Sequence, residues 1–330
     1  MKKIISLLLT IALTFSVVSL CGCDKKTEQP EPQKDAITVA MPDGAPVLSC
    51  FSIMDGDKVI DGHEVKFNVL SGKQNIASVV TSGAADVAVM PTNVAAKLYN
   101  KGVKIKLLSV NVYGVLYVIG QTPIDKTEDL IGKIVYNIGE GGTPDLVLKY
   151  ILDKKGIPYV ESETPVEDKV ALSYVADAQT AVANVKKNAG VYGVVGEPVA
   201  SNAVLKVGAK IVMDMQAEFK ALSDSALTQA GVVVSEKVYN DKTLLAALFE
   251  ELNKNPAYII ENAGKVRSTI NACGSALEVD FNADTLTRCN LKCVSAKDAK
   301  SDLEGYFGEI AAYDDTFIGG KKPDNDFYLG

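Results

Sequence analysis

Short apolar runs alternate with helical segments from residue 36 onward, and this alternation constrains the fold more than any other feature of the sequence. Gly83 and Gly102 end two of the expected helices. The first set of β-prone runs is 36–41, 65–70, 86–90 and 104–110, and the helices expected between them are 46–54, 74–82 and 91–99. Strands that alternate with helices predict βαβ units, a mostly parallel sheet and an α/β fold.

A second set of elements follows the first. A strand is expected at 133–138 and a helix at 144–155. Thr143 is a candidate N-cap for this helix, and Pro144 suits the first helical position. Gly156 marks its end.

The two sets resemble each other in spacing. Gly83 and Pro91 are eight residues apart and flank an apolar run, and Gly190 and Pro198 flank another at the same interval. This repetition favours two similar α/β lobes. We assign 36–115 and 229–330 to the first lobe and 116–228 to the second.

Two segments are candidates for the connections between these lobes. Residues 111–120 form a long β-rich run, and 229–235 is a second apolar run that leads back to the first lobe. Residues 236–330 are then expected to rejoin the first lobe as helices. Two such crossings make a hinge, which permits closure over a ligand.

The first 35 residues have the layout of an export signal and a tether. A basic start (1–3) precedes an apolar run (4–20) that ends in Leu-Cys-Gly-Cys, and this ending resembles a bacterial lipobox. Residues 1–22 are therefore expected to be a signal peptide, with Cys23 as the lipidated residue. Residues 23–35 lack large apolar side chains and predict a disordered tether. The alternative is an uncleaved transmembrane helix, although the run is short for a full span.

Charge and composition exclude several functions. The 330-residue chain has a formal charge of −7, which becomes −9 without residues 1–22 because they contain two lysines and no acid. No basic stripe is present, so a nucleic-acid partner is not expected. A single histidine and the absence of tryptophan leave little for histidine-based hydrolysis. We expect no cofactor and no metal.

Five motifs follow one another along the body of the chain: 83–93, 128–136 (EDLIGKIVY), 141–145 (GGTPD), 196–201 (GEPVAS) and 318–328. In this order they resemble the motifs of nitrate/sulfonate/taurine-type substrate-binding proteins of ABC transporters, a family that includes binding proteins for thiamine-precursor pyrimidines. No single motif is specific to the family, whereas their order and spacing are. Gly196 is a departure, because members often carry Trp before the Glu-Pro turn, so the identity of the ligand is not transferred.

The resemblance implies a type II periplasmic-binding-protein fold, with two lobes, two crossover segments and a ligand cleft between the lobes. It also implies a lipid-anchored extracytoplasmic monomer that serves an ABC permease and ATPase. In such sheets ligands lie at the carboxyl ends of strands, where helix N-termini offer N–H groups. The candidate ligand-binding residues at these turns are Asp43, Gly44, Ala45, Thr92, Asn93, Gly142, Thr143 and Glu197.

Each polar candidate also has a plainer interpretation. Asp43 suits a turn, Thr143 suits a helix cap, and Glu197 can accept hydrogen bonds from amides of its own turn. A free Glu197 would favour a ligand with N–H donors, such as an aminopyrimidine. Helix N-termini instead favour an organic anion.

The remaining candidates are expected to be structural. Core packing is the default for the tyrosines, with ligand stacking as the alternative, and His63 is expected on the surface. The spacing of Cys289 and Cys293 does not match a zinc site. Outside the membrane a disulfide among Cys273, Cys289 and Cys293 is expected, and reduced thiols are the alternative in an anaerobic host. Cys50 is the remaining thiol of the body. The tyrosines concerned are Tyr113, Tyr117, Tyr136 and Tyr192.

Three functional classes follow. The first is a binding protein for an importer, which captures a small organic anion or a heteroaromatic, pyrimidine-like solute. The second is a surface lipoprotein that presents its ligand to a sensor or binds another protein. The third is an enzyme like the pyrimidine synthases on the same fold, which the export signal and the single histidine disfavour. We therefore expect a protein without catalytic residues.

Overall fold

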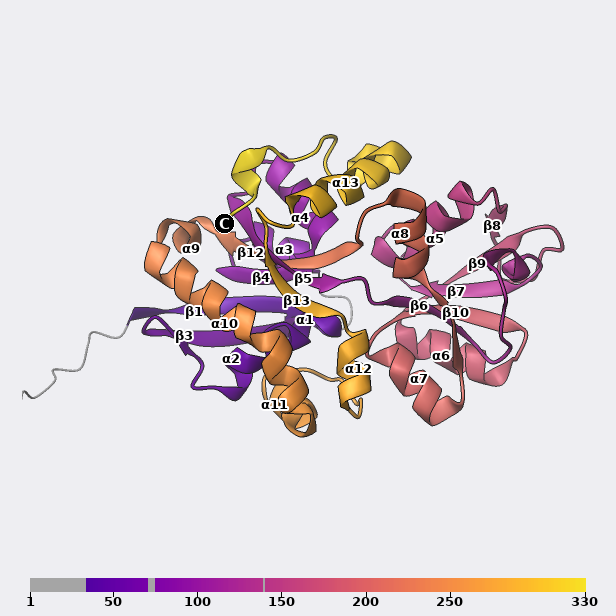
Figure 1. Ribbon diagram of the computed structural model, residues 1–330, viewed down its shortest axis with the longest axis horizontal. Coiled ribbons are helices and arrows are strands. Elements are labelled where there is room, and N and C mark those ends of the chain that lie inside the picture. Colours follow the sequence, from indigo (N-terminus) through magenta and orange to yellow (C-terminus); the bar gives the residue numbers. More distant parts are fainter. Residues whose placement is uncertain (1–33, 71–74, 139) are drawn as a thin grey trace, which may run out of the picture. The chain divides into compact units, whose positions relative to one another are not determined.

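The computed structural model describes residues 34–70, 75–138 and 140–330. The expected signal peptide, Cys23 as the expected lipidated residue and nearly all of the expected tether therefore lie outside the described residues. The described body is an α/β fold with two mixed sheets, and Figure 1 shows the two sheets with their helices. None of the helices in the described part combines the length and the apolar composition that a membrane span requires.

The first sheet has seven strands in the order β13-β5-β12-β4-β1-β3-β2. β1 pairs in parallel with β3 and β4, whereas β12 runs antiparallel between β4 and β5. The expected mostly parallel sheet is therefore wrong in this respect, because β12 returns from the second sheet and enters in the opposite direction. The strands are β1 Lys34–Pro42, β2 Val59–Ile60, β3 His63–Leu70, β4 Val87–Pro91, β5 Ile105–Tyr113, β12 Thr228–Ser235 and β13 Leu291–Ser295.

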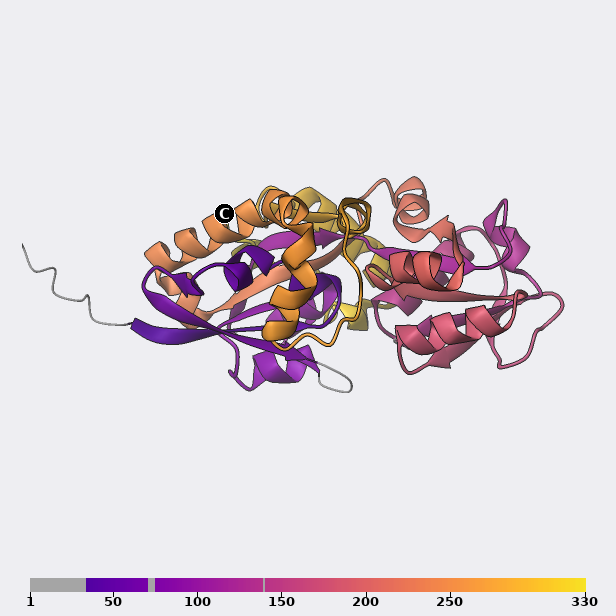
Figure 2. The ribbon, with the colours of Figure 1, turned by 90° about the horizontal axis from the view of Figure 1, so that it is seen from below.

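Helices cover both faces of the first sheet (Figure 2). One face packs on α1, α2, α10, α11 and α12, and the other on α3, α4 and α13. The helix expected at 46–54 is divided into α1 and α2, which leaves Ser49 and Cys50 between them. The helices of this sheet are α1 Ala45–Leu48, α2 Phe51–Asp55, α3 Ile76–Thr81, α4 Thr92–Asn100, α9 Glu236–Asn240, α10 Lys242–Glu261, α11 Val266–Ala272, α12 Ala283–Arg288 and α13 Lys300–Asp314.

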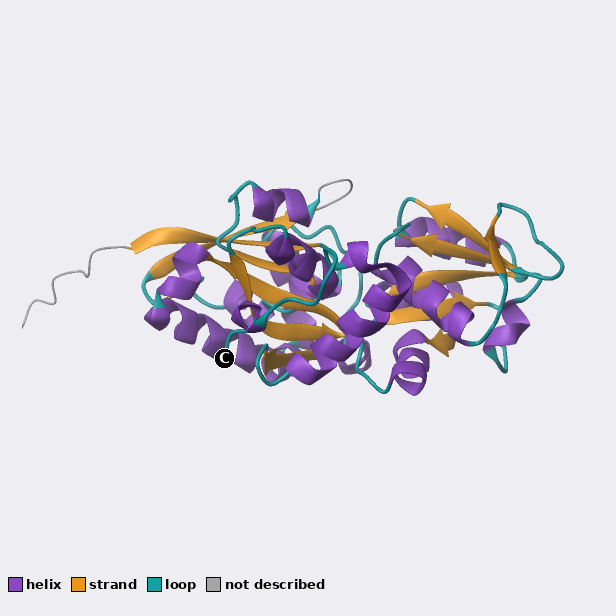
Figure 3. Cartoon of the chain, turned by 90° about the horizontal axis from the view of Figure 1, so that it is seen from above, coloured by secondary structure: helices purple, strands orange, loops and turns teal. Residues whose placement is uncertain are grey.

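The second sheet has six strands in the order β11-β6-β10-β7-β9-β8. Helices again lie on both of its faces (Figure 3), with α6 and α7 on one and α5 and α8 on the other. Its strands are β6 Leu116–Gly120, β7 Ile134–Ile138, β8 Tyr159–Glu161, β9 Val170–Val175, β10 Val191–Gly196 and β11 Lys210–Asp214, and its helices are α5 Thr143–Lys154, α6 Ala178–Lys187, α7 Val199–Val207 and α8 Met215–Ser223.

The chain leaves the first sheet between β5 and β6. Gly114 has φ +62°, and a Cβ placed there would lie 2.7 Å from the Cβ of Gln216. Gln216 in turn accepts a hydrogen bond from the amide of Leu116, and Gln229 accepts one from Val115. Only glycine fits this close approach. Hydrogen bonds to the side chains of Gln216 and Gln229 therefore hold the β5–β6 connection against the part of the chain that returns to the first sheet.

Candidate functional site

All four expected strand-to-helix turns are present. β1, β4, β7 and β10 each end shortly before a helix, namely α1, α4, α5 and α7. Pro91 and Pro198 stand at two of the helix starts, in line with the repeated spacing in the sequence. Ala45, Thr92, Asn93, Thr143 and Glu197 are buried, and Asp43, Gly44 and Gly142 are partly exposed.

Asp43 is held by protein groups. Its Oδ1 accepts hydrogen bonds from Ser275 Oγ at 2.6 Å and from the amide of Gly44 at 3.1 Å, and its Oδ2 accepts one from the amide of Ala276 at 2.8 Å. The carboxylate thus fixes the segment after α11 to the end of β1. This arrangement favours the turn interpretation of Asp43.

Glu197 is also fully engaged. Its side chain is 0% exposed, and it accepts hydrogen bonds from the Ser201 amide at 3.0 Å and from Ser201 Oγ at 2.6 Å. Arg288 Nε donates a third, at 3.0 Å. Glu197 therefore binds the first turn of α7, as its plainer interpretation required, and it also forms an ion pair with a residue from the other end of the chain.

Arg288 is a site residue that the sequence analysis missed. It ends α12, and its Nη2 donates to Ser201 Oγ at 2.7 Å. The side chain is 38% exposed, so one part of the guanidinium faces solvent. The available signal was that Arg288 is one of only two arginines in the sequence.

The thiol of Cys289 and the phenol of Tyr117 lie near this ion pair. Burial raises the pKa of Cys289 well above its usual value, and the negative charge of Glu197 adds to the shift. Burial likewise raises the pKa of Tyr117, with Asp214 and Glu197 contributing. Both groups are thus neutral at physiological pH, and Arg288 is the cation beside the Glu197 carboxylate.

Asn93 differs from the other candidates. Its Oδ1 is buried and has no hydrogen-bond partner among the described residues, whereas its neighbour Thr92 donates to the carbonyl of Thr228 at 2.5 Å. A buried acceptor without a donor is costly, because it has lost its water. A ligand donor would remove this cost.

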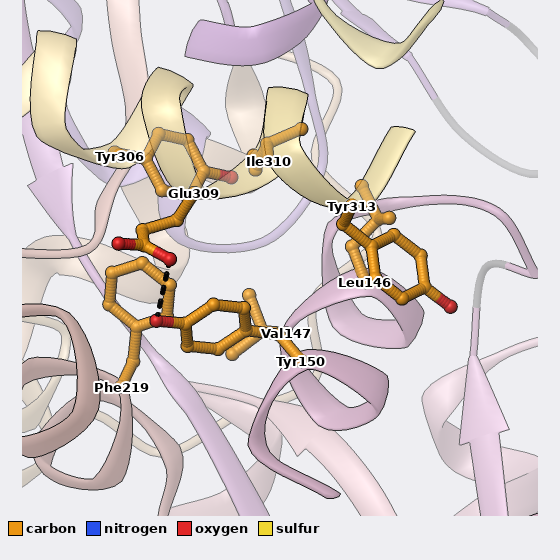
Figure 4. Close-up of a pocket in the computed structure, with 8 residues that line it drawn as sticks. All are labelled: Leu146, Val147, Tyr150, Phe219, Tyr306, Glu309, Ile310 and Tyr313. Atoms are coloured by element: carbon orange, nitrogen blue, oxygen red, sulfur yellow. Dashed lines mark hydrogen bonds between the residues drawn. The ribbon is translucent and has the colours of Figure 1, made fainter. Parts of the chain in front are cut away.

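Thr143 is the first residue of α5, and Gly142 is the N-cap, so the expected Thr143 cap is wrong. The Thr143 hydroxyl instead faces the phenol of Tyr306 in α13. Burial raises the pKa of Tyr306, and the contact with Thr143 partly offsets this increase. Figure 4 shows Tyr306 close to Tyr150 and Phe219, and the ring centroids of Phe219 lie 4.9 Å from Tyr150 and 5.8 Å from Tyr306. The cavity there is about 10 Å³, which is room for one water.

A larger hollow of about 440 Å³ lies between α6, α7 and residues 276–279. Its polar lining includes Gln179, Asn202, Lys206 and Glu278. The volume is within the range of small-molecule sites. It adjoins the helix that follows Glu197 and the segment that Asp43 fixes, although its lining residues were not predicted from the sequence.

The other expectations had mixed outcomes. Tyr113, Tyr117 and Tyr192 are buried in the core, and Tyr136 is partly buried. His63 is only 7% exposed, so the expected surface position is wrong. The four cysteines that the structure describes are all free, and the disulfide expected among three of them is not formed: Cys50, Cys273, Cys289 and Cys293.

Comparison with known proteins gives a fold but no sequence family. No protein-family model and no curated protein sequence matches the chain. An ABC transporter structure from Parabacteroides distasonis is similar, with 23% identity, a TM-score of 0.74 and coverage of 89% of this chain and 99% of that one. A Candida albicans gene product described as having the generic periplasmic binding protein fold has 13% identity and a TM-score of 0.55, over 88% and 92% of the chains.

The chain has the periplasmic binding protein fold. The aliphatic sulphonate-binding protein SsuA of Escherichia coli shares this fold, with 13% identity and a TM-score of 0.63 over 89% of this chain and 90% of that one. These likenesses confirm the fold expected from the sequence motifs.

Proposed function

We propose that the chain is the extracytoplasmic substrate-binding lipoprotein of an ABC importer. The likeness to the Parabacteroides distasonis ABC transporter structure carries this proposal, because it extends over 89% of the chain. In this proposal residues 36–115 and 229–330 form one lobe, residues 116–228 form the other, and Cys23 holds the lipid. The partners are a small solute, the permease and the ATPase, and the protein acts as a monomer without turnover.

The proposed ligand site comprises the turns at Asp43–Ala45, Thr92–Asn93, Gly142–Thr143 and Glu197. The unpartnered Oδ1 of Asn93 supports it, because a ligand donor would complete a buried acceptor. Glu197 and Asp43 act in this site by fixing its walls, since their carboxylate oxygens already accept protein hydrogen bonds.

The same contacts favour one ligand class over the other. An aminopyrimidine would need a free carboxylate at Glu197, and that carboxylate is paired with Arg288. The partly exposed guanidinium and the helix N-termini favour a ligand with a negative group, such as a sulfonate or a carboxylate. A donor on the same ligand would bind Asn93. We therefore propose a small organic anion with at least one N–H or O–H donor.

The test is to identify what the protein carries. Ligand released from the purified full chain by acid is expected to give a single small anion in mass spectrometry. Calorimetry with that compound should show saturable binding, and small-angle scattering should show a smaller radius of gyration with ligand bound. Chemical conversion of the compound during incubation, or release of a cation only, would refute the proposal.

A further inference from the structure

Asp61, His63 and Asp241 form a cluster of possible metal ligands at the opposite end of β1 from the turns described above. The ligand atoms of the three side chains all lie within 4.8 Å of one another. Asp61 and Gly62 form the two-residue turn between β2 and β3, with φ +49° and +77°, which is the pattern of an Asp-Gly hairpin. Asp241 is the N-cap of α10. Two backbone segments far apart in the sequence, the β2–β3 hairpin and the start of α10, thus hold the cluster.

The His63 ring has a defined tautomer. Nδ1 lies 2.7 Å from the carbonyl oxygen of Asp35, and because a carbonyl can only accept, Nδ1 carries the proton. In the neutral ring, Nε2 then carries the lone pair. The ring is 7% exposed, and Nε2 is buried with no hydrogen-bond partner among the described residues. A backbone carbonyl that fixes one ring nitrogen while the other stays free is the usual arrangement of a metal-binding histidine.

The two carboxylates lie close together. Lys34 Nζ donates a hydrogen bond to Asp61 Oδ2, and the backbone amide of Leu244 donates one to Asp241 Oδ1. Thr243 Oγ1 lies 3.1 Å from Asp61 Oδ2 and 2.9 Å from Asp241 Oδ1. Lys34 Nζ, 2.6 Å from Asp61 Oδ2, is the cation beside the pair. One ammonium offsets only one of two negative charges.

We infer that Asp61, His63 and Asp241 bind a divalent transition-metal ion, with zinc as the best match. One imidazole and two carboxylates make a three-residue ligand set that zinc accepts, with water in the fourth position. Zinc ligands in a tetrahedral site lie about 3.4 Å apart. The carboxylates must therefore move inward by rotation of their side chains, and Lys34 must leave Asp61.

Such an ion would join the start of β1, the β2–β3 hairpin and the N-terminus of α10. Asp35 and Asp43 are eight residues apart in an extended strand, so the metal would lie about 26 Å from the Asp43 turn. The site is thus separate from the proposed ligand site. It would fix the body where the chain emerges from residues 23–35. No metal was expected from the sequence, because it has a single histidine and its cysteine spacing does not match a zinc site.

Zinc titration of the purified full chain by calorimetry tests this inference. One site is expected in the wild type. His63→Gln and Asp241→Asn should each weaken zinc binding about tenfold or more. Asp241→Asn isolates the effect of the charge, because the asparagine oxygen can still accept the N-cap hydrogen bond from the Leu244 amide. Glu64→Gln, which changes an exposed acid next to His63, is the matched control and should bind like the wild type.

Lys34→Gln separates a metal site from a merely structural ion pair. It removes the competing ammonium, so zinc affinity should rise severalfold even if the metal-free protein melts earlier. Zinc should raise the melting temperature of the wild type and of Lys34→Gln, and should raise that of Asp241→Asn by less. Zinc affinity equal to the wild type in both His63→Gln and Asp241→Asn would overturn the inference, because the ion would then bind elsewhere, for example at the thiols.

Discussion

The ion pair between Glu197 and Arg288 should be a main stabilising contact between the helix after β10 and the C-terminal part of the chain. We consider Glu197→Gln, which keeps the shape of the side chain. Glu197 Oε2 accepts from the Ser201 amide, and Oε1 accepts from Arg288 Nε and Ser201 Oγ. The amide nitrogen of glutamine must occupy one of these two positions. In either orientation an N–H group then faces another donor.

The size of the effect follows from these contacts. A hydrogen bond to a charged group contributes about 1.5–3 kcal/mol, and loss of one partner of a buried ion pair costs about 3–5 kcal/mol. The Arg288 side chain is 38% exposed, so water can hydrate its guanidinium in the variant, which reduces the loss of stability. We expect the free energy of unfolding to fall by about 2 kcal/mol. For about 300 folded residues, an unfolding entropy of about 2.1 cal/mol/K per residue converts this loss into a fall of about 3 °C in the melting temperature.

Denaturant unfolding of the wild type, Glu197→Gln, Arg288→Met and the double variant gives the coupling energy of the pair. We expect a coupling of about 1 kcal/mol or more. Glu251→Gln is the control, since Glu251 forms an exposed pair with Lys254 and should cost less than about 0.5 kcal/mol. A Glu197→Gln variant as stable as this control, with additive effects in the double variant, would refute the reasoning.

Three further predictions concern other parts of the chain. Cys23→Ser should release the protein from the membrane or block signal-peptide cleavage, as membrane fractionation and intact-mass measurement would show; unchanged anchoring with normal processing would contradict it. Asn93→Ala and Gly142→Val should each weaken binding of the co-purified ligand by about tenfold in calorimetry, with unchanged melting temperatures as the folding control. Tyr258 donates a hydrogen bond to Asp55, and this is the main cause that lowers the pKa of Asp55. The stability that the Asp55 carboxylate contributes is therefore present above its ordinary pKa of 3.8, and it is lost as the pH falls through the pKa of the folded state. Asp55→Asn should therefore be less stable than the wild type at pH 7 by about 1 kcal/mol, with a difference that shrinks below pH 4 in urea titrations; a constant difference would argue against this.

Local signals explain which parts of the fold were predictable. The starts of α4 and α7 follow Pro91 and Pro198, and the end of α5 is marked by Gly156, so proline and glycine placed these elements correctly. β13 was missed, because Leu291–Ser295 is short and contains a lysine and a serine, and only its pairing with β5 makes it a strand.

Long-range contacts explain what was not predictable. Arg288 binds Glu197 from 91 positions away in the sequence, and no local pattern links the two residues. His63 has the polar neighbours of a surface turn, yet Asp35 on the adjacent strand fixes its ring and buries it. The turns could thus be predicted from the sequence, whereas the partners of their side chains could not.

The position of β12 has a consequence for how the chain is made. β12 pairs with both β4 and β5, although it is synthesised more than a hundred residues after them. A growing chain that has not yet reached Ser235 therefore exposes edges of both strands, and such edges promote aggregation. The first sheet closes only when most of the polypeptide is available. Folding by this route is slow, because distant segments must meet before their contacts stabilise the sheet, and it lengthens the time for which the unfinished chain is prone to aggregate.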